Sequence, residues 1–287
     1  MKLGKDIAVA LKGFGMGAAN VVPGVSGGTI ALITNIYSEI VEALNSFSDI
    51  STWKDLFHGR FGSFWERIHG WFLLALAAGV LLSVFSLAKF MTYALENHPV
   101  LTWAFFFGLI IASAVLMLKD VKGWKIRDGI IVALGAALGV IVCTLSPTQT
   151  PDDLWFIFIC GALAICTMIL PGISGSFILV ILGKYDYIMQ AVGDLNWPVL
   201  IVFGLGCVIG LLMFAKLLHL LLARWERETM LVLVGFILGS LVKVWPWHDM
   251  TVAEAGGLHI PGAILWCIIG VALVLGIDLL GRKAERN

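Results

Sequence analysis

Two short breaks in apolar sequence most constrain what this chain can fold into. Residues 23–27 read Pro-Gly-Val-Ser-Gly, and residues 171–175 read Pro-Gly-Ile-Ser-Gly. Proline removes a backbone donor and blocks the preceding helical turn, while glycine adopts backbone angles that other residues avoid. Because lipid cannot satisfy the freed backbone groups, such a break at membrane depth persists only inside protein or beside a wet cavity. Paired breaks in corresponding halves of a chain indicate a transporter's binding site.

Composition places these breaks in a membrane. Of the 287 residues, 60% are hydrophobic and 13% are charged, and several apolar runs approach the length that spans a bilayer. We therefore predict an all-α polytopic membrane protein. The net charge is zero, so nothing favours nucleic acid as a partner. The five cysteines lie in apolar segments without CxxC spacing, which predicts free thiols and neither a metal site nor a cofactor.

The apolar segments divide into short arms and full spans. The arms on either side of each break are too short to cross a bilayer, which predicts re-entrant helical hairpins at 6–46 and 154–191. Residues 47–68 mix charged residues with tryptophan and are expected to form an interfacial loop. Transmembrane helices are expected at about 70–95, 100–118, 129–146, 197–222, 229–245 and 261–281.

The chain repeats itself. A shift of 148 positions superposes Pro23 on Pro171 and Ser26 on Ser174, and a shift of 127 pairs Gly79 with Gly206, Gly108 with Gly235 and Ser113 with Ser240. The first repeat is therefore predicted to cover residues 1–146 and the second residues 154–287. Each repeat consists of a hairpin and three spans. Since a hairpin returns to its own side, each repeat crosses the membrane an odd number of times, and the second repeat must be inverted.

Charge distribution tests this topology independently. With both termini in the cytoplasm, fifteen of the nineteen lysines and arginines lie in cytoplasmic segments, as the positive-inside rule requires. These are Lys2, Lys5, Lys12, Lys54, Arg60, Arg67, Lys119, Lys122, Lys125, Arg127, Arg224, Arg227, Arg282, Lys283 and Arg286. The outer loops carry acidic residues instead, among them Asp152 and Asp153.

The serines of the two breaks suggest two kinds of chemistry. Ser26 and Ser174 are placed to cap the helices that follow, and a helix N-terminus suits an anion. Gly-x-Ser-Gly also surrounds the nucleophile of rhomboid-type intramembrane proteases, but that chemistry needs a base within reach. Only His219 lies well within an apolar run, so we favour capping serines and predict no catalytic residue. Asn20 precedes the first break and can either satisfy its backbone or touch a substrate.

A few ionisable residues lie in or beside apolar segments, where charge is costly and often functional. Lys89 and Lys216 occupy equivalent places in the two repeats, and each can either contact a phosphate or extend its ammonium to the interface. Lys184 follows the second break and has no charged counterpart in the first repeat. Glu39 and Asp186 are candidates for ion coupling or are ordinary interfacial charges.

The sequence at both breaks resembles that of the bacterial polyprenyl-phosphate transporter family. The resemblance rests on Asn-x-x-Pro-Gly-Val-Ser-Gly-Gly-Thr at 20–29 and Leu-Pro-Gly-Ile-Ser-Gly-Ser-Phe at 170–177, each followed by a tyrosine-bearing stretch, and covers essentially the whole chain. It implies a flippase that returns undecaprenyl phosphate from the outer to the cytoplasmic leaflet of the inner membrane, for recycling in cell-wall synthesis. Its expected partners are this lipid and the surrounding membrane lipids, and a homo-oligomer is compatible with it.

The resemblance also implies which residues face the substrate. The implied headgroup-facing residues are Pro23, Gly24, Ser26, Gly27, Gly28, Thr29, Pro171, Gly172, Ser174, Gly175 and Ser176. No arginine lies in either hairpin, so the counter-charge must come from backbone N–H groups, hydroxyls or the lysines. Two other functions remain open: an intramembrane hydrolase, such as a rhomboid-like protease or a lipid phosphatase, and an ion-coupled carrier of small anions.

Overall fold

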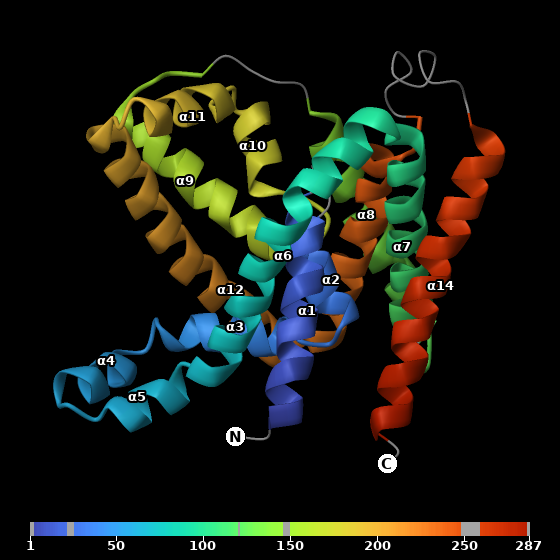
Figure 1. Cartoon of the computed structure of the whole chain (residues 1–287). Coiled ribbons are helices and arrows are strands. Elements are labelled where there is room, and N and C mark those ends of the chain that lie inside the picture. The colour runs from blue at the N-terminus through green and yellow to red at the C-terminus, as the bar shows by residue number, and fades with distance from the viewer. Residues whose placement is uncertain (1–2, 22–25, 120, 146–149, 248–258, 286–287) are drawn as a thin grey trace. The chain divides into compact units, whose positions relative to one another are not determined.

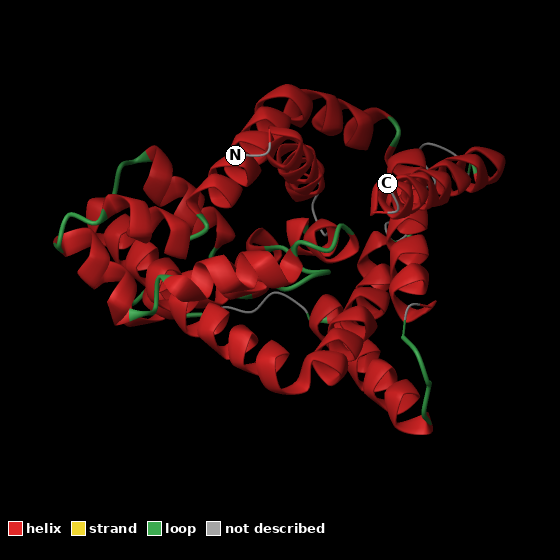
Figure 2. Cartoon of the chain, turned by 90° about the horizontal axis from the view of Figure 1, so that it is seen from below, coloured by secondary structure: helices red, strands yellow, loops and turns green. Residues whose placement is uncertain are grey.

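The described part of the chain is helical throughout. The computed structural model describes residues 3–21, 26–119, 121–145, 150–247 and 259–285, and these contain helices joined by short loops, with no strand among them (Figures 1 and 2). The helices are α1 (Leu3–Val21), α2 (Gly27–Ile33), α3 (Tyr37–Ser46), α4 (Ile50–Phe57), α5 (Phe61–Arg67), α6 (Gly70–Asn97), α7 (Pro99–Lys119), α8 (Ile126–Thr144), α9 (Leu154–Ile169), α10 (Gly175–Ile181), α11 (Tyr185–Gly193), α12 (Trp197–Val244) and α14 (Ile260–Glu285). The predicted all-helical class is thereby confirmed.

Helix boundaries follow the shifts found in the sequence. Moving α2 by 148 positions gives the bounds of α10, and the same shift carries the end of α1 onto the end of α9. A shift of 127 carries the start of α6 onto the start of α12. It also carries His98, between α6 and α7, onto Trp225, whose φ of −138° and ψ of 52° interrupt α12. The duplication visible in residue types therefore extends to where the helices begin and end.

The chain forms two compact units, and both halves of the sequence contribute to each. The first unit comprises residues 1–85 and 145–229, and therefore holds both breaks; the second comprises residues 86–144 and 230–287. We call residues 20–29 the first tip and residues 168–177 the second tip.

Local signals stop α2 and α10 after seven residues each. Asn35 and Gly183 follow the respective C-caps and adopt left-handed angles, with φ of 56° and 62°. Ile36 N–H donates to Ala31 O, and Lys184 N–H donates to Leu179 O, which is the hydrogen bond that defines a Schellman motif. Seven residues rise only about 10 Å, so neither helix can cross a bilayer. The predicted second arms, 26–46 and 174–191, are thus each divided into two helices.

Close glycine crossings hold the first unit together. A Cβ on Gly79 of α6 would overlap the carbonyl oxygen of Ala10 in α1, and one on Gly206 of α12 would overlap that of Phe158 in α9. These two crossings are equivalent under the sequence shifts. Small residues let helices approach closely where packing, not water exclusion, drives association in a membrane. The pairing of Gly79 with Gly206 therefore marks a contact made twice.

The second unit uses a similar device. Gly135 and Gly139 of α8 face Gly235 and Gly239 of α12, each pair spaced four residues apart as in small-xxx-small interfaces. In the other helix pair of this unit, a Cβ on Gly108 of α7 would overlap the backbone of Cys267 in α14. Helices of the first half thus pack against helices of the second half in this unit.

Several helices are long and apolar enough to cross a membrane. In the described residues these are α6 over 70–87, α7, α8 and α12, while α9 and residues 260–276 of α14 are shorter apolar helices. At 1.5 Å per residue the 48 residues of α12 would extend about 72 Å, more than twice the hydrocarbon thickness of about 30 Å. The interruption at Trp225 divides α12 close to the spans predicted at 197–222 and 229–245, although no loop separates them.

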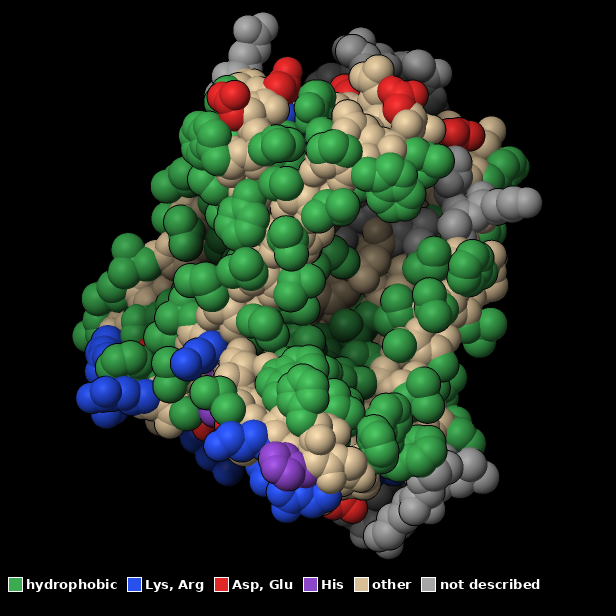
Figure 3. Space-filling model, turned by 90° about the vertical axis from the view of Figure 1, so that its left-hand side faces the viewer, with side chains coloured by type: hydrophobic (Ala, Val, Ile, Leu, Met, Phe, Trp, Pro, Cys, Tyr) green, Lys and Arg blue, Asp and Glu red, His purple; other side chains and the backbone are tan. Residues whose placement is uncertain are grey.

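The predicted interfacial loop at 47–68 contains two short helices, α4 and α5. Asp55 is 7% exposed and pairs with Arg67 at 2.7 Å and Arg60 at 3.4 Å, which ties the helices together. Phe57 and Phe61 are 82% and 67% exposed. Figure 3 shows basic side chains gathered at the end that carries α4 and α5, beside a largely hydrophobic face. Exposed aromatic and basic side chains on short helices are typical of a membrane interface.

Candidate functional site

The two tips are in direct contact within the first unit. Ser26 Oγ donates to Leu170 O at 3.0 Å, and Gly172 N–H donates to Thr29 Oγ1 at 2.9 Å. Gly28 lies at the closest approach, because a Cβ there would be 2.5 Å from Ile169 O. These contacts join residues more than 140 positions apart. The structure therefore brings together the two breaks that the sequence identified separately.

The first tip is closed by its own hydrogen bonds. Ser26 is the N-cap of α2 and its Oγ accepts from Gly28 N–H at 3.1 Å. Asn20 Oδ1 accepts from Gly27 N–H at 2.7 Å, so this asparagine satisfies the break's backbone, one of the two roles its position allowed. Ser26 and Thr29 are each 1% exposed. The amides of Gly27 and Gly28 already have acceptors, and the capping role predicted for Ser26 is confirmed.

The second tip is more open. Ser174 caps α10 by accepting from Phe177 N–H at 3.3 Å, as predicted, and its Oγ lies 3.2 Å from Ser176 Oγ. Ser176 is exposed, whereas Gly175 and Pro171 are buried. No acceptor in the described part of the chain bonds the amides of Gly175 or Ser176. Two hydroxyls and two unused amides therefore lie together at the start of α10.

Glycine is required at the turn into this tip. Gly172 has a φ of 90°, in the left-handed region that side chains with a Cβ disfavour. Its amide is the one that donates to Thr29. The backbone angle and the contact between the tips therefore depend on the same residue.

Side chains from outside α2 and α10 donate hydrogen bonds to the C-terminal ends of these two short helices. Thr34 and Leu182 are the C-caps of α2 and α10. Lys12 Nζ donates to Thr34 O at 2.8 Å, and Thr150 Oγ1 donates to Leu182 O at 2.5 Å. Lys12 was expected to be a cytoplasmic charge, and its place in the hairpin was missed. A lysine in the middle of the apolar run of α1 was the available signal, because a charge there needs a partner.

Lys184 is committed to the end of the second hairpin. Its side chain is 4% exposed, and its Nζ donates to Thr150 O at 2.7 Å and forms an ion pair with Asp152. The ammonium also lies 5.6 Å from the centre of the Tyr187 ring. A buried lysine is tolerated when it is paired in this way. Its present partners stabilise the hairpin end and do not include the tip.

The other candidate residues are spread over the helices. Lys216 is exposed on α12, Asp186 is exposed in the first turn of α11, and Glu39 is half-buried in the first turn of α3. Among the described residues, no hydrogen bond or ion pair joins the carboxylates of Asp186 and Glu39 to either tip. Lys89 lies in α6, but its side chain falls outside the described residues, as do Pro23 and Gly24.

The packing of α9 against α12 shows how far along α12 Lys216 lies relative to the second tip. α9 and α12 lie side by side in the first unit (Figure 1), and Cys166 Sγ donates to Gly210 O at 3.5 Å. Lys216 is six residues beyond Gly210, and Leu170 is four residues beyond Cys166. At 1.5 Å per residue, both positions lie one to two turns past this contact.

Among the described residues, no base forms a hydrogen bond with either serine hydroxyl. The recorded partners of Ser26 Oγ are Leu170 O and Gly28 N, and those of Ser174 Oγ are Ser176 Oγ and Phe177 N. A serine nucleophile requires a base in hydrogen-bond contact, and none of these groups is one. The observed contacts are those of helix caps and of a joint between two tips.

Apolar helices long enough to span a membrane, together with two paired polar breaks, are typical of helical membrane transporters. The chain belongs to the undecaprenyl phosphate translocase-like family, whose model matches residues 16–257. It is 42% identical to the polyprenyl-phosphate transporter of Vibrio cholerae serotype O1, over 85% of this chain and 79% of that protein. It is 30% identical to the polyprenyl-phosphate transporter of Staphylococcus aureus, over 96% of each chain. No solved structure matches the chain significantly.

Proposed function

We propose that this protein translocates a polyprenyl phosphate, undecaprenyl phosphate, from the outer to the cytoplasmic leaflet of the bacterial inner membrane. The observation that carries the proposal is the direct contact between the two tips, which joins polar backbone from both halves of the chain. Membership of the translocase-like family and two relatives named as polyprenyl-phosphate transporters support the same substrate. Lipid recycling in cell-envelope synthesis is the role that follows.

The phosphate binds at the second tip in this proposal. The amides of Gly175 and Ser176 and the hydroxyls of Ser174 and Ser176 supply donors that the first tip has already used. Several amides and hydroxyls converging on one point can hold an oxyanion without arginine. A charge buried alone is prohibitive, so a lysine must assist, and Lys216 is the described candidate at suitable depth. The first tip supports the second and gives it its shape.

Inverted repeats with both termini in the cytoplasm complete the proposal. The matching helix bounds and equivalent glycine crossings support a duplicated architecture, and the odd number of crossings in each repeat supports inversion. Cysteine-accessibility labelling is the test. Positions 152 and 153 are expected to react from outside and positions 122 and 125 from the cytoplasm. Labelling of both loops from one side would overturn the inverted arrangement.

Translocation itself is tested in proteoliposomes that carry a fluorescent polyprenyl phosphate. Wild-type protein is expected to move the lipid between leaflets. Ser176→Ala and Lys216→Gln should each slow the movement, and Lys89→Gln combined with Lys216→Gln should slow it further. Ala78→Gln, on an exposed face of α6, is the matched control for a new polar side chain. Wild-type rates in all lysine variants would remove the lysines from the site, and an inactive wild type would overturn the proposal.

A further inference from the structure

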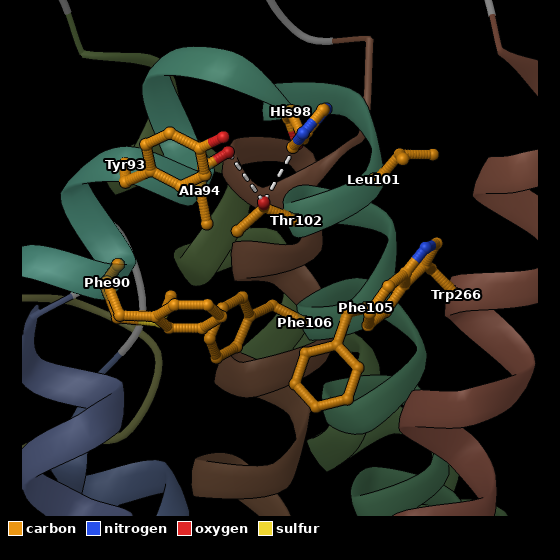
Figure 4. A pocket seen from close by; sticks show the side chains of 10 residues that line it. Phe90, Tyr93, Ala94, His98, Leu101, Thr102, Phe105, Phe106 and Trp266 are labelled. Carbon is orange, nitrogen blue, oxygen red and sulfur yellow. Dashed lines mark hydrogen bonds between the residues drawn. The ribbon is translucent and has the colours of Figure 1, made fainter. Parts of the chain in front are cut away.

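A cavity in the second unit has no part in the site described above. It measures about 420 Å³ and lies between the last turns of α6, the first turns of α7 and the adjoining face of α14 (Figure 4). Aromatic rings form much of its wall: Phe105 lies edge-to-face against Phe106 at 5.3 Å and against Trp266 at 6.2 Å. Such a volume is within the usual range for ligand pockets.

The chemistry of the wall restricts what this cavity can hold. The described residues that line it include no aspartate, glutamate, lysine or arginine. Thr102 Oγ1 lies 3.0 Å from Ala94 O in α6 and 2.9 Å from the O of His98, which follows α6, so its hydroxyl proton is already shared with backbone carbonyls (Figure 4). Tyr93, His98 and Trp266 also carry polar groups, but the surface that the cavity exposes is almost entirely apolar. A hydrocarbon chain fits this wall, whereas a phosphate or another charged group would be left without partners.

We propose that this cavity binds a segment of the polyprenyl chain of the transported lipid and so gives the protein a preference for long prenyl chains. This inference rests on the proposed function. A water molecule occupies about 30 Å³ in the liquid, and a chain carbon needs a similar space. The cavity therefore holds on the order of a dozen chain carbons, which is two or three isoprene units.

The choice of a prenyl chain follows from what surrounds the cavity. A saturated acyl chain gains little by leaving the bilayer, because lipid is as apolar as the cavity wall. A prenyl segment differs, since its alkenes present flat, polarisable surfaces to the rings of Phe105 and Trp266. Its methyl branches also fill the irregular space between rings through dispersion contacts. Close packing, not exclusion from water, supplies the selectivity, so the expected effect is moderate.

Binding of two prenyl phosphates to the purified protein tests this inference. Undecaprenyl phosphate and dimethylallyl phosphate share a headgroup, but the single isoprene unit of the second is too short to fill the cavity. Wild type is expected to prefer the long chain roughly tenfold, or about 1.4 kcal/mol. Ala94→Phe places a ring in the cavity and should reduce that preference to roughly twofold, mainly by weakening the long ligand. Ala78→Phe adds the same ring at an exposed position of α6 and should retain the preference.

Photochemical mapping provides the second measurement. A diazirine on the prenyl chain should cross-link to peptides containing residues 90–106, and excess undecaprenyl phosphate should compete. A diazirine on a phospholipid acyl chain should not label these peptides in a competable way. If Ala94→Phe lowers thermal stability sharply, Ala94→Leu takes its place as the milder filling variant.

The outcomes separate this inference from the proposed function. An unchanged chain-length preference in the filled variants, or labelling by the acyl probe alone, would overturn the prenyl cavity while leaving transport intact. Failure of wild type to bind either prenyl phosphate would overturn the proposed function, and the inference with it. Loss of the long-chain preference together with competable prenyl cross-links supports the cavity.

Discussion

Each tip leads into a seven-residue helix that begins at a serine N-cap and is followed by a residue in the left-handed backbone conformation. Ser26 and Ser174 cap α2 and α10, and Asn35 and Gly183 end them. Beyond this common frame the tips diverge. The first tip uses the amides of Gly27 and Gly28 internally and buries Ser26 and Thr29. In the second tip Ser176 is exposed, and its amide and that of Gly175 have no acceptor among the described residues.

Three substitutions between the repeats account for this difference. Under the shift of 148 positions, Asn20 corresponds to Met168, Gly28 to Ser176 and Thr29 to Phe177. Methionine offers only a weak thioether acceptor where Asn20 Oδ1 accepts the hydrogen bond from Gly27 N–H. Phenylalanine has no hydroxyl that could accept a hydrogen bond, as Thr29 Oγ1 accepts one from Gly172 N–H. The two tips therefore keep the same backbone chemistry while their side chains differ, and the difference leaves the second tip more open than the first.

The largest expected effect comes from closing the gap at Gly28. Gly28→Ala places a Cβ 2.5 Å from Ile169 O, a backbone atom that cannot move independently. Overpacking of this kind costs about 1–3 kcal/mol, and we expect the upper end and loss of transport. Ser176→Ala, at the equivalent position, should leave the thermal midpoint nearly unchanged. Thermal unfolding in detergent measures both, and equal midpoints would show that the tips are not in contact.

The second prediction concerns Thr29. Thr29→Val keeps the shape of the side chain but removes the acceptor for Gly172 N–H, leaving a buried amide unsatisfied. The expected loss of stability is about 2 kcal/mol. Thr29→Ser should recover most of it because the hydroxyl returns. Denaturant or thermal unfolding of the three proteins compares them, and a valine variant as stable as wild type would argue against this hydrogen bond.

The third prediction separates the two capping serines. Ser26→Ala removes a helix cap and also the hydrogen bond to Leu170 O. Ser174→Ala removes only one hydrogen bond to the backbone, the one that caps α10. The Ser26 variant should therefore be less stable than the Ser174 variant by about 1 kcal/mol. Both should retain residual transport, since the loss of a helix cap lowers stability and leaves the proposed transport chemistry in place. Complete loss of activity, with labelling of wild type by a serine-directed probe, would favour an intramembrane hydrolase.

The smallest effect lies in α4, which follows the first hairpin and has no counterpart after the second. Asp49 caps α4, and the bonds from the Ser51 amide and hydroxyl lower the pKa of its carboxyl below the usual value. A lowered folded-state pKa adds stability above the unfolded pKa, and this is lost as pH falls through the folded pKa. Wild type should therefore lose slightly more stability below about pH 4 than Asp49→Asn. Thermal midpoints across that range measure the difference, and parallel curves would contradict it.

The sequence alone could predict most of the backbone. Proline and glycine break helices for local reasons, serine caps them locally, and apolar length sets the spans. The positions of both breaks, the repeat shifts and the N-caps could therefore be read directly. The Schellman motifs at Asn35 and Gly183 were just as local, yet they were missed because an apolar run of this length reads as a single arm. The helices α4 and α5 were missed for a similar reason, since interfacial charge hides a short amphipathic pattern.

Only the tertiary structure decided which polar groups were already used. Ser26 and Leu170 lie 144 positions apart, and no local rule connects a hydroxyl to a carbonyl at that distance. The same holds for the partners of Lys12 and Lys184, whose roles depended on where Thr34 and Asp152 came to lie. Amides, hydroxyls and ammonium groups bind whatever acceptor the packing brings to them. The sequence thus determined what each tip is made of, and helix packing determined which tip remained open.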